Sequence, residues 1–148
     1  MPAGMVGVNV GVAVALRNME IFARDGILEN VRTLEPHLSE RLATLRELPI
    51  VGDVRGAGFF WAMELVKDDA GARFDKTERD RLLRGYLPGR LLDAGLIAGT
   101  DDRGDAVLQI APPLISDRPL LDDIVARLAD VLADAGAHMG VGAKAAVA

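Results

Sequence analysis

Three lysines are the residues of this sequence best suited to covalent chemistry on an amine or carbonyl substrate. Lys67, Lys76 and Lys144 are the only lysines among its 148 residues. A lysine that forms a Schiff base needs a lowered pKa, which a dry apolar pocket provides. Each of the three instead lies in a polar segment or in the C-terminal tail, which predicts solvated surface lysines. Taken alone, the residues show no catalytic constellation.

Other polar motifs also favour structural roles. The adjacent acids Asp101-Asp102 are residues that general acid–base catalysis uses, but their place in a polar turn predicts a solvated loop. Gly56 and Gly58 lack the third glycine of a dinucleotide-binding fingerprint, so we interpret them as close-packing glycines. Arg103-Gly104-Asp105 spells a cell-adhesion tripeptide, and without a secretory signal it is interpreted as part of the same turn.

Composition argues against several further classes of function. No cysteine is present, which removes disulfides, thiolate nucleophiles and cysteine-based zinc sites. His37 and His138 are far apart in the sequence, so no metal site is expected. The 17 basic and 22 acidic residues give a net charge of −5 without a basic cluster, which argues against a nucleic-acid partner.

The apolar stretch 4–16 bears on location. It is shorter than the roughly 20 apolar residues that a membrane-spanning helix needs, and no basic segment precedes it as in a signal peptide. Gly7 and Gly11 have the spacing that allows close helix contact, so we expect a helix packed on its own or a partner domain. The chain is predicted to be soluble and cytoplasmic, without a membrane partner.

Two helices begin the set of elements that must position any site. Residues 9–24 are predicted to form the first helix, which ends at Asp25-Gly26 because glycine suits a helix C-terminus. Apolar residues at three- and four-residue spacings predict a second helix over about 27–48. Pro36 predicts a kink or a break within it.

The middle of the chain predicts one strand and a third helix. The apolar run 59–66 predicts a buried strand, whereas the glycine-rich segment 50–58 before it is not assigned a strand. A third helix is predicted over about 77–94. Pro88-Gly89 predicts a kink or a restart within that helix.

The last third predicts a hairpin followed by a helix. Residues 96–98 and 107–110 are expected to pair as antiparallel strands. Ser116 or Asp117 is expected to cap the last helix, and the residues after Gly136 are predicted to be a flexible tail.

This order of elements predicts an α+β fold, in which a small antiparallel sheet carries helices on one side. The whole chain, 1–148, is expected to form a single domain. Its core is expected over about 7–135, and the flexible tail is expected over 136–148.

Several stretches, taken in order, resemble the C-terminal region of class III aminotransferases. The resemblance is strongest to the branch that transfers amino groups between ω-amino compounds and pyruvate. Its clearest part is 48–66, where Val54-Arg55-Gly56-Ala57-Gly58 is similar to the family's V-R-G-x-G entry to a strand that ends in Glu64-Leu65. The helical segment 13–31, Gly95-Leu96-Ile97 and the stretch 101–115 are similar in order and spacing. The resemblance covers about residues 7–135.

The resemblance implies the C-terminal small domain of a fold type I aminotransferase, with an antiparallel sheet covered by helices. It also implies pyridoxal phosphate, which acts as an electron sink and is held by a lysine. In the family that lysine and the other cofactor-binding residues lie in the large domain, N-terminal to the region matched here. No catalytic and no cofactor-binding residue is therefore expected in this chain, which is expected to bind no pyridoxal phosphate alone.

Two places depart from the family pattern. Val8-Asn9 stand where the family usually has His-Pro before its long helix. Gly99 stands where many ω-aminotransferases carry an arginine that pairs with the substrate carboxylate. Arg103, four residues on, is the candidate substitute, and a turn arginine in water is the alternative interpretation. Gly99 and Arg103 are thus the candidate substrate-binding positions that the resemblance implies.

Competing hypotheses remain open at this point. The first is a fragment of an aminotransferase that moves an amino group from an amine or ω-amino acid to a keto acid such as pyruvate. This fragment would be inactive alone, and its partner would be the missing large domain or a full-length aminotransferase chain. The alternative is a non-catalytic binding or dimerisation module that keeps the fold and forms a homo-oligomer. A free-standing enzyme has the least support.

Overall fold

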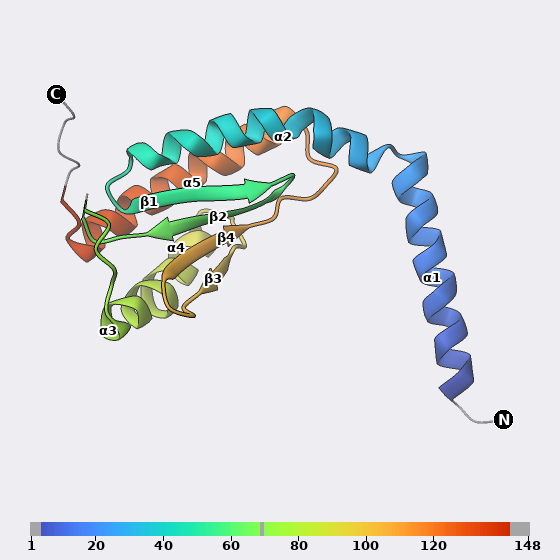
Figure 1. Ribbon diagram of the computed structural model, residues 1–148, viewed down its shortest axis with the longest axis horizontal. Helices are drawn as coiled ribbons and strands as arrows, with labels where there is room; N and C mark the ends of the chain where they lie inside the picture. Colours follow the sequence, from blue (N-terminus) through green and yellow to red (C-terminus); the bar gives the residue numbers. More distant parts are fainter. Residues whose placement is uncertain (1–3, 69, 143–148) are drawn as a thin grey trace.

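The computed structural model describes residues 4–68 and 70–142, with side chains from Val10 onward. Helical and extended segments alternate along most of this length (Figure 1). In chain order they are α1 (Gly4–Arg24), α2 (Ile27–Ala43), the 3₁₀ turn η1 (Thr44–Glu47), β1 (Val51–Ala57), β2 (Phe60–Leu65), α3 (Lys76–Arg79), the π-helical segment η2 (Asp80–Tyr86), α4 (Leu87–Asp93), β3 (Gly99–Asp101), β4 (Ala106–Ile110) and α5 (Arg118–Met139).

The four strands form one sheet in the order β1-β2-β4-β3, and each neighbouring pair is antiparallel. Helices α4 and α5 lie behind this sheet in Figure 1, and α2 runs along its upper edge beside α5. The predicted α+β fold with a small antiparallel sheet is therefore confirmed, and so is the antiparallel pairing of the last two strands.

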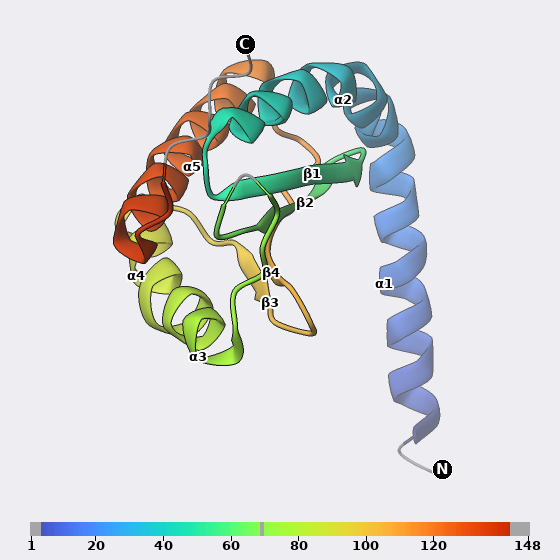
Figure 2. The same ribbon diagram turned by 60° about the vertical axis from the view of Figure 1, so that its left-hand side comes forward.

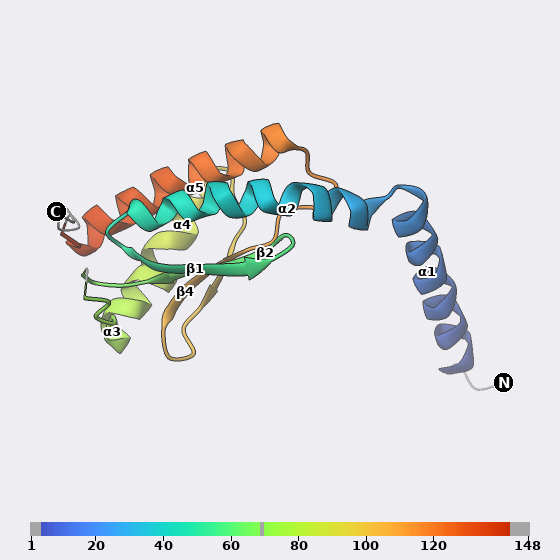
Figure 3. The ribbon, with the colours of Figure 1, turned by 45° about the horizontal axis from the view of Figure 1, so that its top comes forward.

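Alternation along the central strands explains why only one face carries helices. Trp61, Met63 and Leu65 of β2 are buried, while the residues between them are half-exposed. Residues of β4 alternate in the same way, because successive side chains of a strand point to opposite faces. The buried set packs against apolar residues of α2 and α5 in one core. Figure 3 shows these two helices side by side over the sheet. The opposite face of the sheet is left open.

Helix α2 runs through Pro36 without a break, so the predicted break at this proline is wrong. Pro36 lies on the exposed side of the helix, where water can satisfy the carbonyl group that the missing N–H would have bound. The helix ends at Ala43 rather than near Leu48, and η1 tightens the chain before β1.

The third predicted helix consists of three consecutive helical pieces. A capping box starts it, in which Asp75 accepts from the Glu78 amide and the Glu78 side chain accepts from the Asp75 amide. The π-helical segment η2 then leads into α4, with Pro88 in the first turn of α4. The predicted restart at Pro88-Gly89 is confirmed, because proline has no N–H to continue the preceding register.

Strand β1 was absent from the sequence-based prediction, and its glycines explain why. Only Val51 and Val54 of this strand are buried, and an irregular register between Val51 and Asp53 interrupts the alternation. Gly56 lies so close to β2 that an added Cβ would sit 2.3 Å from the Phe60 carbonyl oxygen. The interpretation of Gly56 as a close-packing residue is therefore confirmed.

Two boundaries near the C-terminal end also need correction. The edge strand β3 comprises Gly99–Asp101, and the predicted strand 96–98 is instead the connection that precedes it. Asp117 caps helix α5, and its side chain accepts from the Leu120 amide at 3.1 Å. Of the two predicted caps, Asp117 is therefore the one that is confirmed. The helix continues past the predicted start of the tail to Met139, and Gly136 is buried within it next to Ile50. Part of the predicted tail, 143–148, lies outside the described residues.

Helix α1 projects away from the sheet and joins the rest of the chain at a corner with α2 (Figure 2). Gly26 makes this corner with a left-handed backbone conformation, φ 62°. The predicted contact of this helix with its own domain is limited to the region of the corner. Among the residues that the structure describes, no helix is long and apolar enough to cross a bilayer.

Candidate functional site

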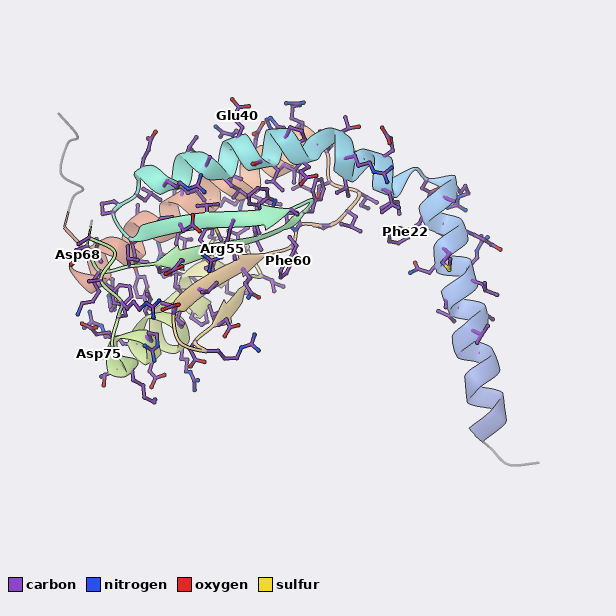
Figure 4. All side chains as sticks on the ribbon, viewed as in Figure 1. Phe22, Glu40, Arg55, Phe60, Asp68 and Asp75 are labelled. Carbon is purple, nitrogen blue, oxygen red and sulfur yellow. The ribbon has the colours of Figure 1, made fainter. Side chains whose placement is uncertain are left out.

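The open face of the sheet carries a paired charge cluster. Arg55 of β1 donates to Asp53 at 2.9 Å and to Glu64 of β2 at 3.0 Å. Hydrogen bonds with Glu64 and then Asp53 raise the pKa of Arg55, and the bond from Arg55 lowers the pKa of Asp53. Figure 4 places Arg55 on this part of the sheet. The cluster links β1 to β2, which supports a structural role for Arg55.

A hollow of about 330 Å³ lies at the end of the sheet beside Gly99. Phe60, Ile97 and Ala111 contribute apolar surface to it, and the Gln109 carboxamide is its polar group. An added Cβ on Gly99 would lie 3.6 Å from the Gln109 side chain, an ordinary contact distance. None of the described residues that line the hollow is charged, so it suits an uncharged part of a ligand better than a carboxylate.

Arg103 does not reach this hollow. It lies in the turn after β3, and its side chain is 86% exposed. Its guanidinium donates to Asp101 Oδ1 at 3.1 Å and to Asp101 Oδ2 at 2.6 Å. The two candidate substrate-binding positions are therefore not brought together, and Arg103 is engaged by its neighbour.

The pairing of Arg103 with Asp101 predicts how the Asp101 carboxyl group titrates. The side-chain hydrogen bond from Arg103 lowers the pKa of Asp101 from 3.8 to about 2. The folded-state pKa is depressed, so the pair is intact at neutral pH and is lost as the pH falls toward 2. Replacing Arg103→Ala should move the Asp101 titration back toward 3.8, as followed by the NMR shift of its carboxyl carbon. An unchanged midpoint would show that Arg103 is free of Asp101 in solution.

The described lysines do not provide a reactive amine. Lys67 pairs with Glu78 at 2.8 Å, and this hydrogen bond raises the pKa of Lys67. Lys76 pairs with Asp80 at 2.6 Å and is largely exposed. The arrangement at Lys67 stabilises the protonated ammonium form, whereas a Schiff base requires a neutral amine. Lys144 lies outside the described residues.

An exposed apolar rim next to the hollow is the feature whose residues the sequence did not reveal. Ile97 is 98% exposed and lies between this hollow and a second one of about 460 Å³, which reaches Leu120 of α5. Phe60, at the start of β2 in Figure 4, lines the same hollow and is also exposed. Large apolar side chains gathered in this way are typical of a surface that contacts another body. Among the described residues, no group of three histidine or acidic residues is placed to hold a metal ion.

Comparison with known proteins gives this surface a context. Residues 6–132 match the family model described as Aminotransferase class-III. A probable aminotransferase of Mycobacterium tuberculosis is 49% identical over 128 residues, which are 86% of this chain and 27% of that protein. A taurine–pyruvate aminotransferase of Bilophila wadsworthia is 35% identical, over 81% of this chain and 26% of its own length.

Solved structures agree with these relatives. The omega-transferase of Vibrio fluvialis superposes with a TM-score of 0.78 and 32% sequence identity, over 88% of this chain and 30% of that one. The PMP-bound form of an aminotransferase from Vibrio fluvialis gives a TM-score of 0.76, with 32% sequence identity, over 88% of this chain and 28% of that one. The chain thus spans between a quarter and a third of the length of each of these four proteins.

Proposed function

Because the chain belongs to the class III aminotransferase family, we propose that it acts as the C-terminal small domain of a pyridoxal-phosphate-dependent enzyme. The proposed enzyme moves an amino group from an amine or ω-amino acid to a keto acid such as pyruvate. The chain alone, which we propose to be a single domain, is inactive in this reaction.

The observation that carries this proposal is the extent of the match. The family model covers residues 6–132, and the superposition on the Vibrio fluvialis enzyme covers most of this chain but 30% of that one. A taurine–pyruvate aminotransferase is among the relatives, which supports pyruvate as the acceptor. The match covers most of this chain but less than a third of the relative. A small domain that keeps its family fold is the simplest explanation.

The surroundings of the lysines support the proposal that this chain depends on a separate large domain. The family uses pyridoxal phosphate, which a lysine must hold. Lys67 and Lys76 are ion-paired, and the pKa of Lys67 is raised, opposite to what that role requires. Neither described lysine suits that role, and we propose that the residues that hold the cofactor come from the large domain. That domain, or a full-length aminotransferase chain, is the proposed partner, and the proposed location is the cytoplasm.

The hollow beside Gly99 supports a choice among amino donors. Its lining is apolar apart from Gln109, and Arg103 is bound to Asp101 rather than directed into it. A donor without a carboxylate would lose no ion pair at this position. We therefore assign Gly99 to the substrate-facing surface, and we expect amines to be better donors than ω-amino acids.

A chimeric enzyme tests the proposal. The 128 matching residues of the Mycobacterium tuberculosis relative would be replaced by the corresponding residues of this chain. The chimera should retain pyridoxal phosphate after desalting and form alanine from pyruvate with a panel of amines and ω-amino acids. The same relative with those residues deleted is the control and should form none. A folded chimera that retains no cofactor would contradict the proposed function.

A further inference from the structure

Gln109 is the polar side chain of the hollow beside Gly99. It is half-buried on β4 between Leu108 and Ile110, which are both buried in the core, so its side chain lies on the open face of the sheet. A carboxamide offers two N–H donors and a carbonyl acceptor. None of the described residues forms a hydrogen bond with this carboxamide. Its donors and acceptor are therefore available to a group from outside the described chain.

The neighbours of Gln109 across the sheet explain why its carboxamide has no partner. Gln109 pairs with Ala62 of β2 on one side and with Gly99 of β3 on the other, and both have minimal side chains. An added Cβ on Gly99 would lie 3.6 Å from the carboxamide oxygen, so glycine leaves this side of the group uncovered. Arg55 is the next residue across the sheet beyond Ala62, but two carboxylates already hold its guanidinium.

The walls of the hollow restrict which ligand groups suit this carboxamide. Phe60, Ile97 and Ala111 make them apolar. A carboxylate would meet no cation among the described lining residues, and burial of an unpaired charge is unfavourable. A hydrocarbon would exclude water from the carboxamide without replacing the lost hydrogen bonds. A neutral hydroxyl group avoids both penalties, because it can donate to the carboxamide oxygen or accept from the carboxamide nitrogen.

We infer that Gln109 is a specificity-determining residue of the proposed aminotransferase, and that its carboxamide hydrogen-bonds with a hydroxyl group of the amino donor. This inference rests on the proposed function. It narrows the donor class from amines in general to amines that carry a neutral hydroxyl group. Gly99 is required for this recognition, because a larger side chain there would cover the carboxamide.

The test compares donors that differ in one terminal group, and it uses the chimeric enzyme. 4-Amino-1-butanol and pentylamine differ only in a terminal hydroxyl or methyl group, and 5-aminopentanoate ends in a carboxylate. Shorter and longer homologues of all three bring the end group to different depths. The unsubstituted chimera should have its highest kcat/KM with an amino alcohol. Gln109→Leu should lower the ratio of kcat/KM for that alcohol to kcat/KM for the matching alkylamine about tenfold, because one hydrogen bond is lost.

Two further variants separate recognition from folding. Gly99→Val keeps Gln109 but covers its carboxamide, so it should lower the same ratio. Val107→Thr is the matched control, because Val107 is half-buried on the same strand and face as Gln109 but lies outside the hollow. Threonine is close to valine in size, and the ratio should stay unchanged in this variant.

Other results would overturn the inference in distinguishable ways. An unchanged ratio in Gln109→Leu would show that Gln109 does not select the donor. An equal loss of activity with the alcohol and the alkylamine would assign Gln109 a structural role instead. A chimera that prefers alkylamines or ω-amino acids at every chain length would overturn the hydroxyl class and leave the amino-transfer function intact. A chimera that forms no alanine with any donor would contradict the proposed function itself, and the inference with it.

Discussion

Alanine at position 56 should lower the free energy of unfolding by about 3 kcal/mol, a large effect for one methyl group. Its Cβ would lie 2.3 Å from the Phe60 carbonyl oxygen and 2.7 Å from the Trp61 Cα. Both are backbone atoms, so the clash cannot be relieved by rotating a side chain. Gly56 pairs with Trp61 in the register of the sheet. Relieving the clash would therefore require β1 and β2 to move apart at this pair.

Trp61 makes this effect easy to measure. It is the only tryptophan, it is buried, and its indole N–H donates to the Gly58 carbonyl at 2.8 Å. Urea unfolding followed by its fluorescence should show an earlier midpoint for Gly56→Ala. Gly89→Ala is the control, because nothing lies within 4 Å of an added Cβ there and alanine favours a helix. Equal midpoints for Gly56→Ala and the unsubstituted chain would contradict the close approach of β1 and β2.

Leu108→Ala should lower the free energy of unfolding by about 2–5 kcal/mol, the range for a large-to-small substitution in a packed core. Leu108 is fully buried in β4, opposite Met63 of β2 and Thr100 of β3. Its side chain belongs to the core that joins the sheet to the helices. A cavity at this position would therefore affect both layers of the fold.

Ile97→Ala should change the free energy of unfolding by less than about 0.5 kcal/mol. Ile97 is 98% exposed, so alanine removes little packing from the chain alone. Chemical unfolding of the Leu108→Ala and Ile97→Ala variants gives the comparison directly. If Ile97→Ala is as destabilising as Leu108→Ala, the rim is part of the chain's own core rather than a surface for another body.

The sequence predicted the elements whose apolar pattern is regular. The stripe of α2, the apolar strand β2 and the capped helix α5 all follow from spacing and end signals, and all three are present. Strand β1 did not follow, because Gly52 and Gly56 replace the side chains that would mark its faces. Its position depends on a tertiary contact with β2, which local sequence does not express.

The candidate site was predictable only in part. Gly99 and Arg103 were chosen by resemblance, but the pairing of Arg103 with Asp101 depends on the geometry of the turn after β3. The exposure of Ile97 likewise depends on where β3 begins, and the predicted strand was placed three residues too early. A three-residue strand at a sheet edge has too few positions for an alternating pattern to be recognised.

The central claim is that this chain needs a cofactor-bearing large domain, and one titration tests it most directly. The purified 148-residue chain would be mixed with pyridoxal phosphate, treated with borohydride and analysed by intact mass and peptide mapping. We predict that no lysine will carry one cofactor per chain, because Lys67 and Lys76 are each ion-paired with a carboxylate and the pKa of Lys67 is raised. Stoichiometric trapping on Lys67, Lys76 or Lys144 would contradict the claim and would make that lysine the centre of a site within this chain.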